Sequence, residues 1–252
     1  MTKQGARRFP GGPLFPFLAL LAALALPTAA QDLKSATSPD GQLEFRIFLA
    51  QQDDTALFRL AYQIWFRGQR LLDTSFMGFD IWEQEPLLGE NVGLIASSTE
   101  AKPEYNGLTG RYLQNGSLGR ALSVETRIYN DGVAFRYNLL KSMPMAELFI
   151  SDETTEFALG RPVPERASLP FRTEQPGVAW LEISELGVSG FPKMSLGRSA
   201  DNVLVSRLTT IPGNHGYLFA GRTPFTGPWR TIGIAPSPER LRTDLWPSRL
   251  AK

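Results

Sequence analysis

The chain has 252 residues, with 26 Lys and Arg against 25 Asp and Glu, so its net charge is +1. A composition this balanced provides no basic field for binding nucleic acid. The chain has no cysteine and one histidine, which excludes disulfides, thiolate metal sites, thiol nucleophiles and histidine clusters for a metal. The hydrophobic content of 42% is enough for a buried core.

Residues 1–30 have the pattern of a secretory signal peptide. Three basic residues and no acidic residue come first, followed by an apolar run over residues 14–26 and a Pro-Thr-Ala-Ala exit at 27–30. The run is shorter than the roughly 20 residues of a membrane span, which counts against the alternative of an uncleaved anchor. We expect an exported, periplasmic or secreted protein, with a mature chain 31–252 that has no membrane span and a net charge of −2.

Apolar residues that alternate with polar ones predict strands through most of the mature chain. Residues 43–49 and 58–66 follow a period of two, which places one face of each strand on a core. Residues 124–128 and 133–139 flank an Asn-Asp-Gly turn, a hairpin signal because these residues tolerate positive φ angles. Further strands are predicted at residues 148–150, 178–183, 203–208, 217–220 and 231–235.

The spacing of breakers supports an all-β fold. No stretch of twelve or more residues has a clean helical period, and 23 glycines and 19 prolines are spread along the chain. Residues 84–120 have the weakest pattern and are predicted to form long loops. Many short strands joined by turns predict a large antiparallel β-sandwich, formed as one domain by residues 31–252.

Carboxylates and aromatic rings are the side chains of this chain that are candidates for a chemical or binding role. It has no Gly-rich phosphate loop and no nucleophile-elbow motif, and His215 stands in a turn where a solvated side chain is the more common case. Carboxylate pairs serve glycoside hydrolysis and calcium binding, although acids on strands and turns are most often solvated. Tryptophans can stack on sugar rings, although large aromatics more often fill a core. The residues concerned are Glu153, Glu156, Glu174, Glu182 and Glu185, with Trp65, Trp82, Trp180, Trp229 and Trp246.

Three strings, taken together, resemble the N-terminal domain of glycoside hydrolase family 97. The first is TRIYNDGVAFRY at residues 126–137. The second joins ETTEF at 153–157 to FRTE at 171–174, and the third is TGPWRTIGIA at 226–235. Their order and spacing match over roughly residues 33–246, which is nearly the whole mature chain.

The resemblance implies a fold, partners and a metal site. Members of this family are exported, calcium-dependent α-glycosidases that act on α-glucosides or α-galactosides. Their N-terminal domain is a large sandwich of the mutarotase-like kind, a supersandwich, which packs on a catalytic (β/α)₈ barrel and lends a carboxylate to a calcium site in its mouth. Glu174, after the family-like Phe-Arg-Thr string, is the candidate for that carboxylate and Glu185 is the second; an ordinary turn acid is the equal alternative for Glu174.

The resemblance places the catalytic acid and its nucleophile or base in the barrel, so no catalytic residue is predicted in this chain. A barrel needs about 250 residues, whereas this sequence reaches Lys252 a few residues past the closing strand, with residues 245–250 as the start of a linker. We therefore expect a chain without the barrel, without activity alone, and with calcium bound only if a barrel partner completes the site.

Three functions are compatible with these features. The first is a non-catalytic sandwich that binds carbohydrate or docks to a glycosidase barrel. The second is one subunit of a split calcium-dependent α-glycosidase whose barrel is separately encoded. The third is an independent sugar epimerase, which the single histidine counts against because such enzymes resemble one another in using histidines with a glutamate as acid and base.

Overall fold

A computed structural model describes residues 31–251 apart from 52–56, 117–118, 188 and 211–215. The predicted signal peptide and His215 lie outside these described residues. Strands make up most of the described chain, and their pairing is antiparallel throughout the named ladders. No helix in the described ranges is long and apolar enough to cross a bilayer.

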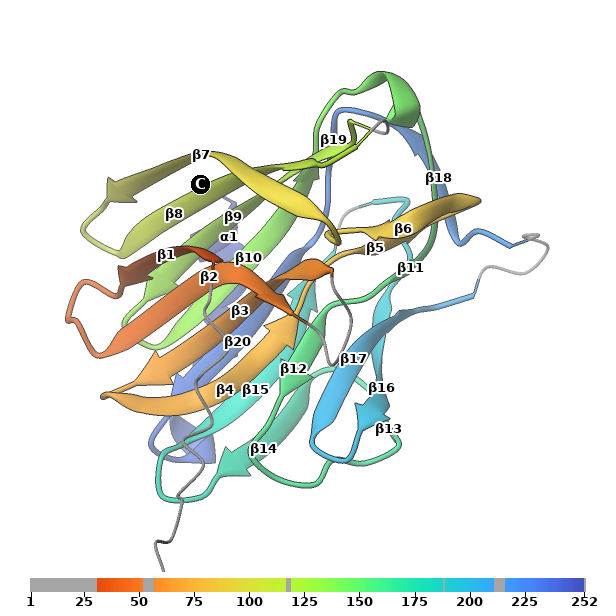
Figure 1. The fold of residues 1–252 in the computed structure, drawn as a ribbon. Helices are drawn as coiled ribbons and strands as arrows, with labels where there is room; N and C mark the ends of the chain where they lie inside the picture. Colours follow the sequence, from red (N-terminus) through yellow and green to blue (C-terminus); the bar gives the residue numbers. More distant parts are fainter. Residues whose placement is uncertain (1–30, 52–56, 117–118, 188, 211–215, 252) are drawn as a thin grey trace, which may run out of the picture.

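One layer of the molecule is an eight-stranded sheet with the order β14-β15-β20-β10-β9-β8-β7, to which β19 adds by pairing with β10 (Figure 1). Its strands are β7 (Val92–Ala101), β8 (Tyr105–Gln114), β9 (Ala121–Tyr129), β10 (Gly132–Leu139), β14 (Phe171–Gln175), β15 (Ala179–Leu186), β19 (Phe225–Thr226) and β20 (Trp229–Ala235). Because β20 lies between β10 and β15, the end of the chain closes the middle of this sheet.

Three four-stranded sheets complete the fold, with the orders β1-β2-β3-β4, β18-β11-β5-β6 and β12-β17-β16-β13. The first consists of β1 (Gln31–Thr37), β2 (Leu43–Gln51), β3 (Phe58–Phe66) and β4 (Gln69–Phe76). The second consists of β5 (Phe79–Ile81), β6 (Gln84–Leu88), β11 (Glu147–Glu153) and β18 (Phe219–Arg222). The third consists of β12 (Glu156–Ala158), β13 (Arg166–Ala167), β16 (Met194–Ala200) and β17 (Val203–Leu208). The helical segments are η1 (Met143–Met145), η2 (Pro238–Arg240), η3 (Thr243–Leu245) and α1 (Trp246–Leu250).

The β1–β4 sheet lies over one face of the eight-stranded sheet, and the core fills the space between them (Figure 1). Alternate residues of β2 and β3 are fully buried, and their rings meet rings from β10. The centroids of Phe45 and Tyr62 are 5.6 Å apart, and Tyr62 lies 5.2 Å from Phe135. Ring pairs at these separations add to the stabilisation that comes from burial. The predicted all-β sandwich is confirmed.

The β9–β10 hairpin forms at the predicted place, with Tyr129 paired to Gly132 across a two-residue turn. Asn130 and Asp131 do not take the positive φ expected of this turn, whereas Gly132 has a φ of +159°. The glycine also has a packing role. A Cβ on Gly132 would lie 2.9 Å from the Trp246 ring, so the missing side chain lets that ring approach the hairpin.

The prediction of long loops over residues 84–120 is wrong. This stretch contains β6 and the long β7–β8 hairpin at the edge of the eight-stranded sheet. From Ala96 to Ala101 every residue of β7 is exposed, so neither face needs the apolar residues that produce an alternating pattern. In β8, Gly107 and Gly110 lie close to the side chains of Glu100 and Tyr112, which explains glycine inside a strand.

The C-terminal segment covers part of the outer face of the eight-stranded sheet. Trp246 and Leu250 of α1 pack against Tyr129, Ala134 and Trp229 in a second apolar cluster. The Arg249 guanidinium donates two hydrogen bonds, of 2.8 and 3.0 Å, to the Asp131 carboxylate in the hairpin turn. The residues predicted to begin a linker therefore form part of the fold.

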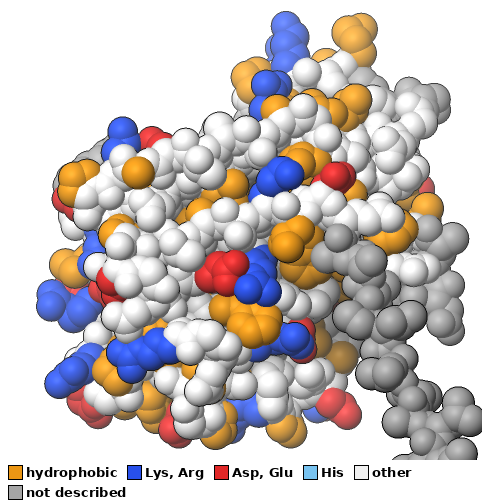
Figure 2. Space-filling view, turned by 60° about the vertical axis from the view of Figure 1, so that its left-hand side comes forward, with side chains coloured by type: hydrophobic (Ala, Val, Ile, Leu, Met, Phe, Trp, Pro, Cys, Tyr) orange, Lys and Arg blue, Asp and Glu red, His pale blue; other side chains and the backbone are white. Residues whose placement is uncertain are grey.

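Charge is mixed on the surface. On the face shown in Figure 2, basic and acidic side chains are interspersed and the hydrophobic side chains form small separate groups. Several surface cations lie next to acids, as in the Arg46–Glu44 pair at 2.7 Å and the Arg70–Asp73 pair at 2.9 Å. This pattern fits the balanced composition, which provides no basic field for nucleic acid.

Candidate functional site

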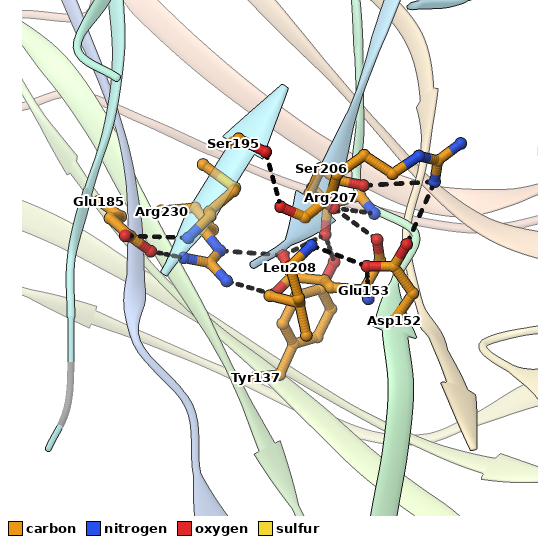
Figure 3. A network of polar contacts seen from close by, with 11 residues as sticks. Tyr137, Asp152, Glu153, Glu185, Ser195, Ser206, Arg207, Leu208 and Arg230 are labelled. Carbon is orange, nitrogen blue, oxygen red and sulfur yellow. Dashed lines mark hydrogen bonds and ion pairs between the residues drawn. The ribbon is translucent and has the colours of Figure 1, made fainter. Parts of the chain in front are cut away.

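The interior contains a buried ion cluster that joins two sheets (Figure 3). Arg230 of β20 lies directly opposite Glu185 of β15, and its Nη1 donates to Glu185 Oε2 at 2.5 Å. The same guanidinium binds Glu153 of β11 through two hydrogen bonds, of which Nε to Oε1 is 2.9 Å and the second joins Nη2 to Oε2. Arg230 and Glu153 are completely buried, whereas the Glu185 side chain is 14% exposed.

Position in the strands explains this arrangement. Arg230 shares the inward face of β20 with Ile232 and Ile234, and its backbone pairs with Phe135 on β10. Burial acts to lower the pKa of Arg230, but the adjacent Glu153 and Glu185 carboxylates outweigh it and raise the pKa above its ordinary value. The guanidinium therefore stays charged, and one buried and one partly exposed carboxylate share one cation.

Hydroxyl groups satisfy the remaining acceptors around Glu153. The Thr155 hydroxyl donates to Glu153 Oε1 at 2.7 Å and has no second proton to give, so the Tyr137 hydroxyl donates to Thr155 across 2.5 Å. The Ser206 hydroxyl donates to the Glu153 carbonyl at 2.7 Å. Burial raises the pKa of Tyr137 well above its ordinary value, and the charge of Glu153 acts in the same direction. Tyr137 is therefore a proton donor at neutral pH.

A third carboxylate, that of Asp152, lies at the edge of this cluster. Its Oδ1 accepts the backbone N–H groups of Leu208 and Glu153, both at 2.9 Å, and its Oδ2 lies 3.5 Å from Arg207 Nη1. Burial raises the pKa of Asp152, while the two backbone donors and Arg207 oppose the rise. These contacts fix β11 against β17.

Glu185 opens onto a pocket of about 800 Å³ at one end of β15 and β16. The Met194 backbone N–H donates to Glu185 Oε1 at 3.0 Å, so each carboxylate oxygen already has one donor. Each oxygen has a second lone pair for a further partner. Leu169, Phe191 and Lys193 contribute apolar surface and a cation to the same pocket. A ligand in this pocket would therefore meet a fixed, partly exposed carboxylate.

Glu174, the first predicted metal ligand, has different surroundings. It is exposed on the edge strand β14, opposite Trp180 of β15, and its carbonyl accepts Arg161 Nη1 at 2.9 Å. Glu174 lies beside Trp180, and Trp180 is five residues from Glu185 along β15, so the two predicted acids are about 17 Å apart. Because five is an odd number of residues, their side chains also point to opposite faces of the sheet. The structure does not bring Glu174 and Glu185 together.

The remaining predicted acids have separate roles. Glu182 is buried on the outer face of the sheet and binds Arg172 Nε at 2.5 Å, and Glu156 accepts the Phe76 N–H at 3.3 Å. Among the described residues, no group of three or more His, Cys, Asp or Glu side chains is arranged to hold a metal. Calcium takes six to eight oxygens, so Glu185 fits as one ligand of a calcium site that needs further oxygens from elsewhere.

The tryptophans divide into two sets. Trp229 and Trp246 are buried in the outer apolar cluster, as large aromatics commonly are. Trp65, Trp82 and Trp180 are half-buried. The rings of Trp65 and Trp82 have different neighbours: the Arg46 guanidinium lies 4.4 Å from the Trp65 centroid, whereas Trp82 lines a small pocket with Phe149 and Tyr217.

The sequence pattern did not single out Arg230, although this residue lies within the TGPWRTIGIA string at residues 226–235. The signal in the sequence was a single arginine directly before the uncharged residues of the strand predicted at 231–235. In the structure this strand is β20, and all seven of its residues are buried. A buried arginine requires hydrogen-bond acceptors, and carboxylates are the acceptors that also balance its charge. Those partners lie 45 and 77 positions away in the sequence, so spacing could not reveal them.

The fold and the pocket define an all-β sandwich domain with one carboxylate fixed at an open pocket by a buried arginine. Comparison with known families is consistent with this class of domain. The chain belongs to the glycosyl-hydrolase 97 N-terminal family, whose model matches residues 36–164.

Similar proteins are longer than this chain. It is 29% identical over 136 residues to a retaining α-galactosidase of Bacteroides thetaiotaomicron, covering 48% of this chain and 18% of that protein. A family 97 glycoside hydrolase from Pseudoalteromonas sp. strain K8, solved with panose, superposes with a TM-score of 0.67 at 20% identity, over 81% of this chain and 36% of that one. A β-arabinopyranosidase gives a TM-score of 0.64 at 20% identity, over 81% and 40%. The chain thus spans well under half of each relative.

Proposed function

We propose that this chain is the non-catalytic sandwich of a glycosidase, and that it docks to a (β/α)₈ barrel and presents Glu185 to the mouth of the barrel. The observation that carries the proposal is the Glu185 pocket. The carboxylate is partly exposed, fixed by Arg230 and Met194, and has lone pairs left to accept another partner. A contributed ligand needs this combination of access and rigid placement.

The relatives support the same reading. The family model describes an N-terminal domain, and each relative has more than half of its length outside the part that matches this chain. The α-galactosidase and the β-arabinopyranosidase are glycosidases by name. The proposed barrel can come from a separately encoded polypeptide, in which case this chain is one subunit of a split α-glycosidase exported to the periplasm or secreted.

Calcium is part of the proposal. Bound at the junction, it would supply a fixed positive charge that orients the sugar hydroxyls, with Glu185 as the ligand from the sandwich and the other oxygens from the barrel. Glu174 stays the alternative ligand. It is exposed, and no contact among the described residues fixes its carboxylate, whereas both oxygens of Glu185 are held in place.

The test mixes this chain with a separately produced family 97 barrel, calcium and an aryl α-glycoside. We expect hydrolysis above that of either protein alone. Glu185→Gln should lower it by at least about tenfold and weaken its calcium dependence, since a neutral amide is a poorer ligand than a carboxylate. Glu174→Gln is the matched control and should leave hydrolysis unchanged. No gain on mixing would overturn docking, and a loss only in Glu174→Gln would move the ligand to Glu174.

A second candidate function is carbohydrate binding by this chain itself. It is favoured by the half-buried aromatic rings around Trp82, because sugar rings stack on accessible aromatic faces. The panose complex of the Pseudoalteromonas enzyme shows that one family 97 protein binds an oligosaccharide. Calorimetric titration of this chain with oligosaccharides tests the function, and the absence of heat across the panel would remove it.

A further inference from the structure

The tip of the β5–β6 hairpin carries a small pocket that the Glu185 site does not use. It encloses about 470 Å³ and is lined by Trp82, Glu83, Gln84, Phe149 and Tyr217. None of these residues lines the Glu185 pocket. Its volume falls in the range of sites for small ligands, which is roughly 300–1,000 Å³.

Three aromatic side chains form the apolar part of this pocket. The Tyr217 centroid lies 6.3 Å from Trp82 and 4.9 Å from Phe149. All three residues are half-buried, so they combine fixed neighbours with accessible surface. Aromatic faces that remain accessible bind the C–H faces of saturated rings, whereas a site for an acidic ligand would need cations, and none lines this pocket among the described residues.

Polar groups stand beside the rings at the same hairpin tip. Trp82 and Glu83 form the turn, since Ile81 pairs with Gln84, and Glu83 has a φ of +54°. This left-handed conformation is strained for a residue with a side chain. The Glu83 side chain is exposed and its carboxylate is a hydrogen-bond acceptor, and the Gln84 amide carries N–H donors and an oxygen that accepts from Arg120. Hydroxyl groups of a sugar require partners of this kind.

The hairpin tip is held in place by hydrogen bonds from the interior of the molecule and from β11. Arg120 is completely buried, and its guanidinium donates to the Gln84 carbonyl at 3.0 Å, to Gln84 Oε1 at 3.4 Å and to Gln114 Oε1 at 2.6 Å. The backbone N–H of Trp82 donates to the backbone carbonyl of Phe149 at 2.9 Å, which connects the tip to β11. A surface fixed before binding loses less conformational entropy when a ligand arrives.

We infer that this pocket binds one pyranose ring of a neutral oligosaccharide, with the ring against Trp82 and Tyr217 and its hydroxyls on Glu83 and Gln84. The inference rests on the second proposed function, carbohydrate binding, and gives it a location. The pocket shares no lining residue with the Glu185 pocket, so the two proposed sites can be altered separately.

The test is calorimetric titration of the whole chain with maltotriose, raffinose and cellotriose. At least one of them should bind the unaltered protein. Trp82→Ala should weaken that binding about tenfold or more, the effect of losing one aromatic contact. The matched control is Trp65→Ala, because Trp65 is also half-buried but its ring contacts the guanidinium groups of Arg46, at 4.4 Å, and Arg70, at 5.1 Å.

Tyr217→Ala is a second variant in case Trp82→Ala does not fold, and circular dichroism checks folding in every case. If none of the three sugars binds the unaltered protein, carbohydrate binding fails as a function and the site fails with it. If a sugar binds and neither Trp82→Ala nor Tyr217→Ala weakens it beyond Trp65→Ala, carbohydrate binding stands and this location is wrong.

Discussion

Arg230 holds one carboxylate from each of two sheets, and both it and Glu153 are completely buried. Removing charges from water costs several kcal/mol per ion, and the cluster offsets that cost with two ion pairs and the hydroxyl of Thr155. The balance depends on Arg230, because without it Glu153 stays completely buried with no cation beside it.

Substitution of Arg230 tests this dependence. Arg230→Met should lower the free energy of unfolding by about 3–5 kcal/mol, because Glu153 then stays buried without its cation. Arg207→Met is the control: Arg207 is half exposed and its one ion pair spans 3.5 Å, so its cost should be below about 1 kcal/mol. Urea denaturation measures both.

A rescue variant distinguishes lost charge balance from lost packing. Arg230→Met combined with Glu153→Leu and Glu185→Leu should recover most of the stability, since apolar residues of similar volume can replace a buried ion cluster. If Arg230→Met costs no more than Arg207→Met, the cluster is not the constraint described above.

At the scale of elements, the sequence predicts strands well where one face is buried. Residues 43–49, 58–66 and 124–139 alternate because their inner residues fill the core, and the structure confirms strands there. The β7–β8 hairpin has an edge strand whose second half is exposed on both faces, so no such pattern marks it. The packing of α1 on the outer face was also not predictable, because it joins residues more than a hundred positions apart.

The α1 segment should stabilise the fold mainly through the buried side chain of Trp246. Trp246 is 4% exposed, and its ring lies 5.4 Å from that of Tyr129. Trp246→Ala should lower the free energy of unfolding by about 3 kcal/mol, the lower end for loss of a large buried aromatic. Met143→Ala, at a residue 92% exposed, should have no measurable effect. A cost below about 1 kcal/mol for Trp246→Ala would mean that α1 separates from the sheet before the sandwich unfolds.

At the scale of the whole molecule, buried tyrosines make the stability of the fold depend on pH. Tyr62, Tyr112 and Tyr137 are all buried, and burial raises the pKa of each above its ordinary value of 10.0. The folded state therefore keeps protons that the unfolded chain releases above about pH 10. Stability is fully present below that pH and falls as pH rises, by up to about 1.4 kcal/mol per pH unit for each tyrosine.

Denaturant unfolding at pH 8 and at about pH 11 measures this fall. Tyr137→Phe should cost about 1 kcal/mol at pH 8, because the hydrogen bond to Thr155 is lost. The same variant should lose less stability between the two pH values than the unaltered protein, since one titrating group has gone. An equal loss in both proteins would assign the alkaline sensitivity to other groups.

The sharing of Arg230 between sheets also has a kinetic consequence. Opening β11 alone would strip Arg230 of Glu153, and opening β20 alone would leave Glu153 and Glu185 without a cation. Opening β20 leaves two carboxylates unpaired, and opening β11 separates the fully buried Arg230–Glu153 pair, so both strands should open in one event. Amide hydrogens of β11, β15 and β20 should then exchange with deuterium as a single slow group, although β11 belongs to a different sheet.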